Sequence, residues 1–320
     1  MTRHVQLPQL AGGMFLTDSG METTLVFHEG MELPYFASFT LLNSEDGRKW
    51  VRGYYERHLQ LAQDACAGFI LDTPTWRANA DWGAKLGWTP EGLAALNTDA
   101  VAMMKELRAL YASRVNPIVI SGNIGPRGDG YVPGEMMSAD EAEAYHRPQI
   151  ETFAKAGVDM TSALTLSYVA EAIGIVRAAV KAGVASVISF TLETDGRLPS
   201  GQSLADAVKE ADAATDAGAA YYMINCAHPD HFESVFTGAA WEQRIRGLRA
   251  NASRRSHAEL NEATELDAGN PEELASQYAA LLVRMPHVNV LGGCCGTDHR
   301  HVAAIGQACC MARNTQQEAR

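Results

Sequence analysis

The chain has 320 residues, of which 47% are hydrophobic, and this is enough for one large domain with an ample core. Lys and Arg total 26 against 38 Asp and Glu, a formal net charge of −12, and no basic run interleaves with aromatic residues, so we expect no nucleic-acid partner. No stretch approaches the ~20 apolar residues of a membrane span, and the first residues lack the apolar segment of a signal peptide. These features predict a cytoplasmic protein that does not bind a membrane.

Short runs rich in β-forming residues recur along the chain, with helical spacing between most of them. Alternating strands and helices must pair in parallel through crossovers, and eight repeats favour closure into a barrel. The seventh run is the weakest, because it carries Arg246 and Arg249. We predict an α/β fold, a (β/α)8 TIM barrel forming a single domain over residues 1–320, with strands at Met14–Thr17, Gly68–Thr73, Pro117–Ser121, Val158–Ser162, Ser186–Leu192, Tyr221–Asn225, Ile245–Arg249 and Val288–Leu291.

Helix ends of the kind that such a barrel needs also occur. Ser138 and Glu141 match the capping box that opens a helix, and Pro148 inside the same pattern predicts a kink or a late start. Glycines follow four helical runs, where a left-handed C-cap residue belongs: Gly68, Gly157, Gly183 and Gly218.

Three connections are too long and too varied for simple turns: residues 24–43, 122–134 and 251–271. In an α/β barrel the loops that follow the strands build the active site. We therefore expect these three segments to contribute to a lid or a substrate site.

Two adjacent cysteines, Cys294 and Cys295, lie in a glycine-rich turn directly after the eighth run, and Cys226 ends the sixth. Thiolates are soft ligands that zinc prefers, and both sulfurs of an adjacent pair can reach one metal only where the backbone turns. A large chain with six cysteines does not suggest a disulfide framework. We predict one Zn²⁺ bound by Cys226, Cys294 and Cys295. Buried small residues or a disulfide between Cys294 and Cys295 are the alternatives, and His228 or His231 could complete a mixed site.

Three protein ligands leave a fourth position open, which is typical of catalytic zinc. Because zinc deprotonates a coordinating thiol, and the thiolate is the nucleophile, the predicted reaction is attack of a substrate sulfur on an activated methyl group. No catalytic residue beyond the metal site is needed once the thiol is ionised.

Five segments resemble the homocysteine S-methyltransferase family, in the same order along the chain. They are residues 16–23, 121–126, 189–192, 224–226 and 292–297. The resemblance implies a (β/α)8 barrel with zinc on the three cysteines, which transfers methyl from a donor such as S-methylmethionine, S-adenosylmethionine or betaine to homocysteine. It also implies that Asp18 holds the amino group of homocysteine. With Asp18 we predict Asn225, Asp72 and Thr165 as substrate-binding residues.

The chain departs from the family pattern where the amino acid head group would bind. Leu164 stands where the family has a glutamate that grips the ammonium group, and Thr24 replaces the glutamate of the first motif. A hydrogen bond to a charged group contributes ~1.5 to 3 kcal/mol, so this loss predicts weaker homocysteine binding.

Two alternatives therefore stay open. The acceptor could be a thiol or selenol without an amino acid head group, or the barrel could bind metal or ligand without catalysis. The expected partners are a small-molecule thiol acceptor and a methyl donor, and exposed barrel helices leave a homo-oligomer open. Tyr35, Phe36, Trp76 and Tyr131 are aromatic candidates for contact with a cationic donor.

Overall fold

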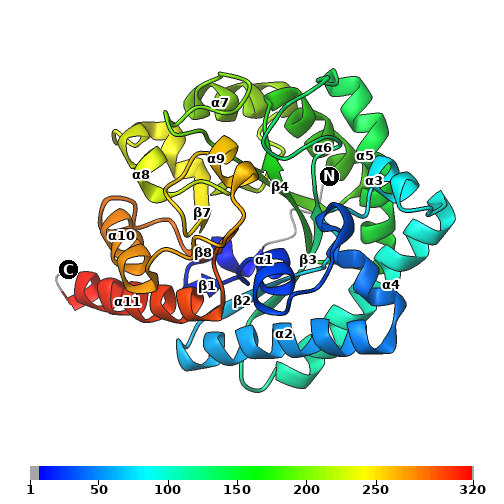
Figure 1. Ribbon diagram of the computed structural model, residues 1–320. Coiled ribbons are helices and arrows are strands. Elements are labelled where there is room, and N and C mark those ends of the chain that lie inside the picture. The colour runs from blue at the N-terminus through cyan, green and yellow to red at the C-terminus, as the bar shows by residue number, and fades with distance from the viewer. Residues whose placement is uncertain (1–6, 319–320) are drawn as a thin grey trace.

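Eight parallel strands close into a barrel in the computed structural model, which describes the backbone of residues 7–318 and the side chains of residues 7–313. The strands follow one another around the barrel in chain order, with helices outside them (Figure 1). Closure comes from β1 pairing with β8, in the register Phe15 to Val290 and Leu16 to Leu291. The strands are β1 Phe15–Leu16, β2 Gly68–Asp72, β3 Ile118–Ile124, β4 Met160–Leu166, β5 Ala185–Phe190, β6 Tyr221–Asn225, β7 Ile245–Ala250 and β8 Val290–Gly293.

Every predicted strand is confirmed, including the seventh. β3 and β4 run three to four residues further than the sequence suggested, because the residues at their ends still pair with neighbouring strands: Asn123 with Ser162, and Leu166 with Phe190. Parallel strands in a barrel are covered on both sides, which is why their runs are nearly continuous in apolar residues.

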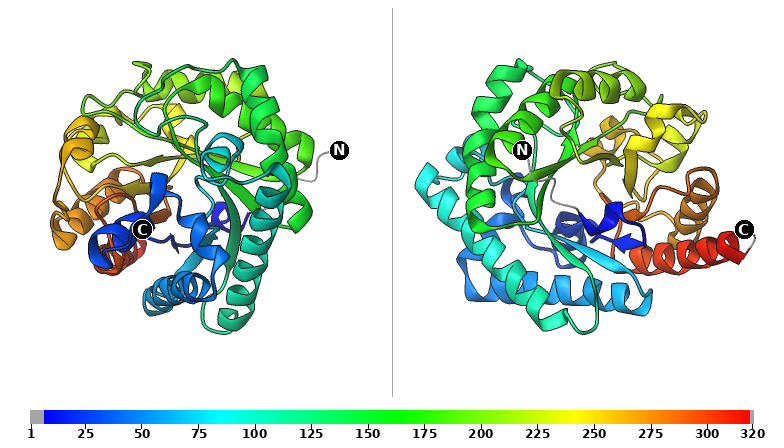
Figure 2. Two further views of the ribbon diagram at one scale, coloured as in Figure 1. Left: turned by 45° about the vertical axis from the view of Figure 1, so that its right-hand side comes forward. Right: turned by 180° about the vertical axis from the view of Figure 1, so that it is seen from behind.

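A ring of helices surrounds the strands in all three views (Figures 1 and 2). Short 3-10 or π turns occur at Pro8–Leu10, Thr24–His28, Pro34–Phe36, Ser38–Asn43, Glu233–Val235 and Ala240–Arg244. The helices are α1 Met21–Thr23, α2 Glu45–Asp64, α3 Ala80–Lys85, α4 Pro90–Tyr111, α5 Ala139–Ala156, α6 Val169–Ala182, α7 Leu204–Thr215, α8 Pro229–Phe232, α9 His257–Glu262, α10 Pro271–Arg284 and α11 His299–Glu318. None of the helices within residues 7–318 is long and apolar enough to cross a membrane.

The predicted helix ends are partly confirmed. Ser138 and Glu141 form the capping box of α5, which begins at Ala139 despite Pro148, so a late start is wrong. Gly157 and Gly183 are left-handed C-caps with φ of 75° and 72°. The other two glycine caps are wrong. Gly68 is already the first residue of β2, and left-handed conformations fall on Cys66 and, after α7, on Asp216 and Ala217.

Apolar side chains fill the barrel interior at the end where the strands begin. Leu7, from the segment before β1, packs among them. This layer is a solid core of the kind that fills other α/β barrels, so ligand space can exist only near the carboxyl ends of the strands. The layer consists of Leu7, Phe15, Ile70, Val119, Met160, Val187, Tyr221, Met223 and Val290.

Candidate active site

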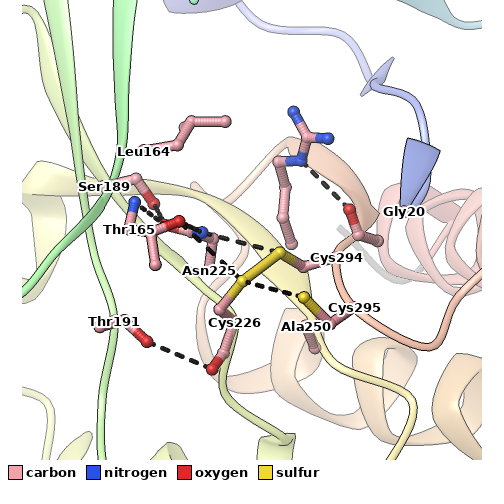
Figure 3. Close-up of a disulfide and its surroundings, with 12 residues drawn as sticks. Gly20, Leu164, Thr165, Ser189, Thr191, Asn225, Cys226, Ala250, Cys294 and Cys295 are labelled. Carbon is pink, nitrogen blue, oxygen red and sulfur yellow. Dashed lines mark hydrogen bonds between the residues drawn. A yellow bond between two sulfur atoms is a disulfide. The ribbon is translucent and has the colours of Figure 1, made fainter. Parts of the chain in front are cut away.

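Three sulfur atoms converge at the carboxyl ends of β6 and β8. The side-chain sulfurs of Cys226, Cys294 and Cys295 all lie within 4.8 Å of one another. In the structure Cys226 and Cys294 are joined as a disulfide, and the sulfur of Cys295 is 3.8 Å from that of Cys226 (Figure 3). The predicted ligand set is therefore brought together. The alternative of a disulfide within the adjacent pair is wrong, because Cys294 is bonded to Cys226 and Cys295 is free.

Backbone geometry aims these sulfurs at one point. Cys226 adopts a left-handed conformation with φ of 53°, which turns its side chain away from the alternation of β6. Its carbonyl oxygen accepts hydrogen bonds from His257 Nε2 at 2.6 Å and Thr191 Oγ1 at 3.2 Å. On the other side, the amide of Cys294 donates to the carbonyl of Ala250 at 2.8 Å, which extends the pairing of β7 and β8 into the turn. Hydrogen bonds at the ends of the strands thus hold the backbone at both Cys226 and Cys294.

The donor set fits zinc when the cysteines are reduced. Three thiolates on one side with open space on the other match a catalytic zinc site with three protein ligands. His228 and His231 are not part of the cluster. The Nδ1 of His228 accepts from the amide of Asp230 at 3.2 Å, and the Nε2 of His231 donates to the carbonyl of Arg254 at 2.9 Å. The mixed Cys/His ligand set therefore has no support among the described residues.

Polar groups next to the sulfurs orient them. The hydroxyl of Tyr131 lies 3.1 Å from the sulfur of Cys295, and Asn225 Nδ2 donates to the sulfur of Cys294 at 3.7 Å. Burial raises the pKa of the Cys295 thiol, and burial together with the nearby thiol raises the pKa of Tyr131, so the phenol keeps its proton as a donor. Donors of this kind stabilise ligating sulfur and tune a bound metal.

Asn225 and Thr165 form one buried unit beneath the sulfurs. Asn225 Oδ1 accepts from the amide of Thr165 at 2.8 Å and from Ser189 Oγ at 2.6 Å, and Asn225 Nδ2 donates to Thr165 Oγ1 at 2.7 Å (Figure 3). Thr165 has a φ of 64°, a left-handed conformation that a β-branched residue adopts only when its surroundings enforce it. Both predicted residues border the cavity, and their bonds fix the end of β4 against β6.

Asp18 and Asp72 share a buried cation that the sequence did not reveal as part of the site. Arg249, from β7, donates from its two terminal nitrogens to Asp18 Oδ1 at 2.6 Å and Asp72 Oδ2 at 2.8 Å. Although burial disfavours the cation, the two carboxylates raise the pKa of Arg249 above its ordinary value. Asp18 lines the cavity and Asp72 does not. The other oxygen of Asp18 lies 3.3 Å from the Tyr54 hydroxyl, which has a shorter contact of 2.9 Å with the carbonyl oxygen of Ser19.

A cavity of about 350 Å³ opens beside the sulfurs. All three long connections contribute to its wall, as predicted: Phe36 comes from the first, Tyr131 from the second and Leu260 from the third. Leu164 lies in the wall with 6% of its surface exposed, so the family's glutamate position faces the cavity as an apolar side chain. Glu22 and Arg77 also line the cavity, and neither was predicted as a site residue.

Several of the aromatic candidates already have partners. The guanidinium carbon of Arg77 lies 4.0 Å from the centre of the Trp76 ring. Tyr131 stacks on His257, with ring centres 4.0 Å apart. Tyr35 and Phe36 remain exposed, at 49% and 52%, and Phe36 lines the cavity. Among the four, Phe36 is therefore the freest to contact a cationic ligand.

Two signals in the sequence pointed to the missed residues. Arg249 stands in a parallel barrel strand, which is covered on both sides, and a buried charge there must have a partner. Arg77 is a charged residue amid a run after β2 that contains Trp76 and Trp82. Glu22 lies one turn from Asp18 in the first motif and gave no comparable signal, because a glutamate at the start of a helix is common.

Comparison with known proteins places this barrel among methyltransferases. Residues 15–309 match the family model described as homocysteine S-methyltransferase. The chain is 23% identical over 325 residues to a selenocysteine Se-methyltransferase of Brassica oleracea var. italica, covering 94% of this chain and 90% of that protein. It is 24% identical over 209 residues to homocysteine S-methyltransferase 3 of Arabidopsis thaliana, covering 62% and 59% of the two chains.

Solved structures share the fold. Crystal structures of the homocysteine methyltransferase MmuM from Escherichia coli superpose with a TM-score of 0.70 for the oxidized form, at 22% identity and covering 92% and 95% of the two chains. The metallated form gives a TM-score of 0.68 at 20% identity, covering 93% and 97%.

Proposed function

This chain belongs to the homocysteine S-methyltransferase family, and we propose that it is a zinc-dependent member that methylates the thiol of homocysteine. The observation that carries the zinc assignment is the convergence of three cysteine sulfurs, within 4.8 Å of one another, on the wall of a cavity. Cys226, Cys294 and Cys295 would hold the metal, which would supply the Lewis acidity that ionises the acceptor thiol.

The reaction balances without further catalytic groups. The acceptor thiolate forms a bond to the methyl carbon while the bond from that carbon to the donor's sulfonium sulfur or ammonium nitrogen breaks, and the electron pair leaves with the neutral donor. No proton moves in this step, so no general base is required. What the chain must supply is alignment of sulfur, methyl carbon and leaving atom.

The cavity wall provides that alignment. Asn225 and Tyr131 hold the cysteine sulfurs from two sides, at 3.7 Å and 3.1 Å. Asp18, fixed by Arg249 and Tyr54, contributes a negative wall near the site of a cationic donor. Phe36 is an exposed aromatic residue in the wall that can contact the donor's cation, and Phe27, 45% exposed, is another.

Replacing one ligand tests the assignment. We expect Cys294→Ser to lose stoichiometric zinc and to reduce the rate of methyl transfer by more than ~100-fold. Replacing a residue that only hydrogen-bonds to a metal ligand already lowers metal affinity or activity by ~10- to 100-fold. The matched control is Cys66→Ser, because Cys66 is exposed and lies outside the cavity. Metal content is measured by atomic emission on reduced protein, and transfer by the methylated product. Full zinc and full turnover in Cys294→Ser would exclude this site.

One observation favours a second acceptor class. Leu164 gives the cavity an apolar surface at the position where a glutamate would bind an ammonium group. Such a surface suits a thiol or selenol without an amino acid head group. Turnover with homocysteine, selenocysteine and a simple alkyl thiol separates the two. Tight zinc binding with no transfer to any of them would instead favour a binding barrel.

Methylation of homocysteine yields methionine, so the proposed role is in methionine synthesis. Free thiol ligands require reducing surroundings, which supports a cytoplasmic location. The barrel closes between β1 and β8, the first and last strands, so all eight strands belong to one closed sheet, which supports a single domain over residues 1–320.

A further inference from the structure

Ionic side chains of both signs line the cavity without an ion-pair partner. Arg77, which follows β2, is the cation, and the carboxylates include Glu22, which follows β1, together with Asp129 and Glu265 from the second and third long connections. Among the described residues, no carboxylate lies within 4.0 Å of Arg77 and no cationic side chain within 4.0 Å of Glu22, in contrast to Arg249, which has two carboxylates. Buried charges are costly unless paired, so an unpaired set of both signs in one cavity suggests an external partner.

Arg77 is fixed in place but has free donors. It is 5% exposed, and its guanidinium carbon lies 4.0 Å from the ring centres of both Trp76 and Trp82. Only one terminal nitrogen is used, donating to the carbonyl of Gly128 at 2.9 Å, and Nε is buried with no hydrogen-bond partner. A guanidinium held flat between two rings, with several N–H groups unused, is preorganised to bind a carboxylate.

Glu22 is held in a similar way. Its Oε1 accepts from the hydroxyl of Ser38 at 2.8 Å, and its side chain is partly buried against the cavity. Burial raises its pKa, against the effect of that hydrogen bond, so a bound cation would favour its ionised form. Glu22, Arg77 and the three cysteines all line the same cavity.

The other carboxylates of the cavity wall have different surroundings from Glu22. Asp18 is paired with Arg249, Asp129 accepts from the backbone amides of Tyr131 and Val132, and Glu265 belongs to the third long connection, while Leu164 is apolar. The side-chain oxygen of Asn123 adds an unused acceptor, since it is buried without a hydrogen-bond partner and Asn123 lines the cavity.

We propose that Glu22 and Arg77 form a two-point receptor for the amino acid head group of the methyl acceptor, with Glu22 binding the ammonium group and Arg77 the carboxylate. This inference rests on the proposed function, because it assumes that the acceptor's sulfur lies at the cysteine cluster. It assigns to Glu22 the role that the apolar Leu164 cannot fill, and it makes an α-amino acid thiol, rather than a simple alkyl thiol, the preferred acceptor class.

Acceptor analogues that lack one charge test each contact separately. Homocysteine carries both groups, 4-mercaptobutanoate lacks the ammonium group and 3-mercaptopropylamine lacks the carboxylate. We expect Glu22→Gln to raise the KM for homocysteine and for the aminothiol by at least ~10-fold, as for loss of a charge-assisted hydrogen bond, and to leave the KM for mercaptobutanoate unchanged. Arg77→Gln should show the opposite selectivity, raising the KM for homocysteine and mercaptobutanoate only. In both variants kcat should change little.

Asp99→Asn is the matched control, because it removes a charge from an exposed pair with Arg48, remote from the cavity. Arg77→Lys keeps the charge and the stem between the two indoles, so it reports on the carboxylate contact if Arg77→Gln does not fold. Leu164→Glu in the Glu22→Gln background should recover homocysteine KM, because it returns a carboxylate to the same cavity. Equal KM changes for all three acceptors in either variant would mean a structural role and overturn the proposal.

A binding measurement without metal separates this inference from the proposed function. In reduced, zinc-free protein we expect L-methionine, the methylated form of homocysteine, to bind to wild type and Asp99→Asn alike, and at least ~10-fold more weakly to Glu22→Gln and to Arg77→Lys. If wild type transfers methyl to none of the thiols but binds methionine through both residues, the methyltransferase proposal fails and the receptor stands. If both variants bound methionine as tightly as wild type does, the receptor proposal would be overturned.

Discussion

Arg249 pairs with two of the residues that were predicted to bind substrate. Asp18 follows β1 and Asp72 ends β2, and both were predicted to bind substrate. In the structure both carboxylates bond to the guanidinium of Arg249, which is 6% exposed, and Arg249 Nε also donates to the carbonyl of Gly293 at 3.2 Å. Arg249 therefore ties the ends of β1, β2 and β8 together next to Cys294. We interpret the three charges as a rigid support for the cysteine cluster, with Asp18 also facing the cavity.

Removing this cation should be strongly destabilising. Arg249→Met leaves two buried carboxylates without compensation, and we expect it to lower the free energy of unfolding by roughly 3–5 kcal/mol. The matched control is Arg48→Met, which breaks an exposed pair with Asp99 and should change stability by less than ~1 kcal/mol. Urea denaturation of all three proteins measures the difference. A loss for Arg249→Met no larger than that of the control would show that the charges are not coupled.

At the level of elements, the site depends on how closely the ends of β1 and β8 approach. Gly292, in β8, has no side chain because one would overlap the side chain of Thr17, and it would also lie 2.8 Å from the carbonyl oxygen of Asp18. The amide of Gly293 donates to that same carbonyl at 3.1 Å. The glycines before Cys294 therefore serve close packing of two strands rather than a left-handed turn. The left-handed glycine of this segment is Gly296, with φ of 79°.

A single methyl group at this junction should separate the two strands. We expect Gly292→Ala to lower stability by ~1–3 kcal/mol, as overpacking does, and to weaken zinc binding, because Asp18 and Cys294 shift with their strands. The control is Gly53→Ala in α2, where an added side chain meets nothing within 4 Å. That substitution should raise stability by ~0.5–1 kcal/mol. Thermal unfolding and zinc titration of both variants give the two measurements, and unchanged zinc affinity in Gly292→Ala would contradict the coupling.

For the molecule as a whole, oxidation and metal binding compete for the same sulfurs. The disulfide takes Cys226 and Cys294, which are 68 residues apart in sequence, out of the ligand set and leaves Cys295 alone. A ligand that binds only the native state stabilises it according to its concentration relative to the dissociation constant. The reduced and oxidised forms should therefore differ in their response to zinc.

We expect zinc at 100 times its dissociation constant to raise the free energy of unfolding of the reduced protein by about 2.7 kcal/mol, and chelation to reverse this. The protein with the Cys226–Cys294 disulfide should gain nothing, and neither should reduced Cys294→Ser. Denaturation curves with and without zinc provide the measurement, with magnesium as the control because it prefers oxygen ligands. Equal stabilisation of the oxidised protein would place the metal elsewhere.

The sequence alone determined the barrel, the order of its strands and the three cysteines at one rim. These follow from local patterns: alternating strand and helix periods, and polar or cysteine residues immediately after apolar runs, which a parallel barrel must place on the same face. The family motifs pointed to the same residues, and the match over residues 15–309 agrees with them.

Only the tertiary structure decided which charges are used and which are free. Asp18 looked available because its partner, Arg249, is 231 residues away in the chain, and Arg77 had no predicted role, although its guanidinium carbon lies 4.0 Å from the ring centres of Trp76 and Trp82. Pairing of buried charges depends on distances between strand ends that no local pattern encodes, and those distances are set only when the barrel closes. The cysteine cluster could thus be predicted from the sequence, whereas the candidate receptor beside it emerged from the folded chain.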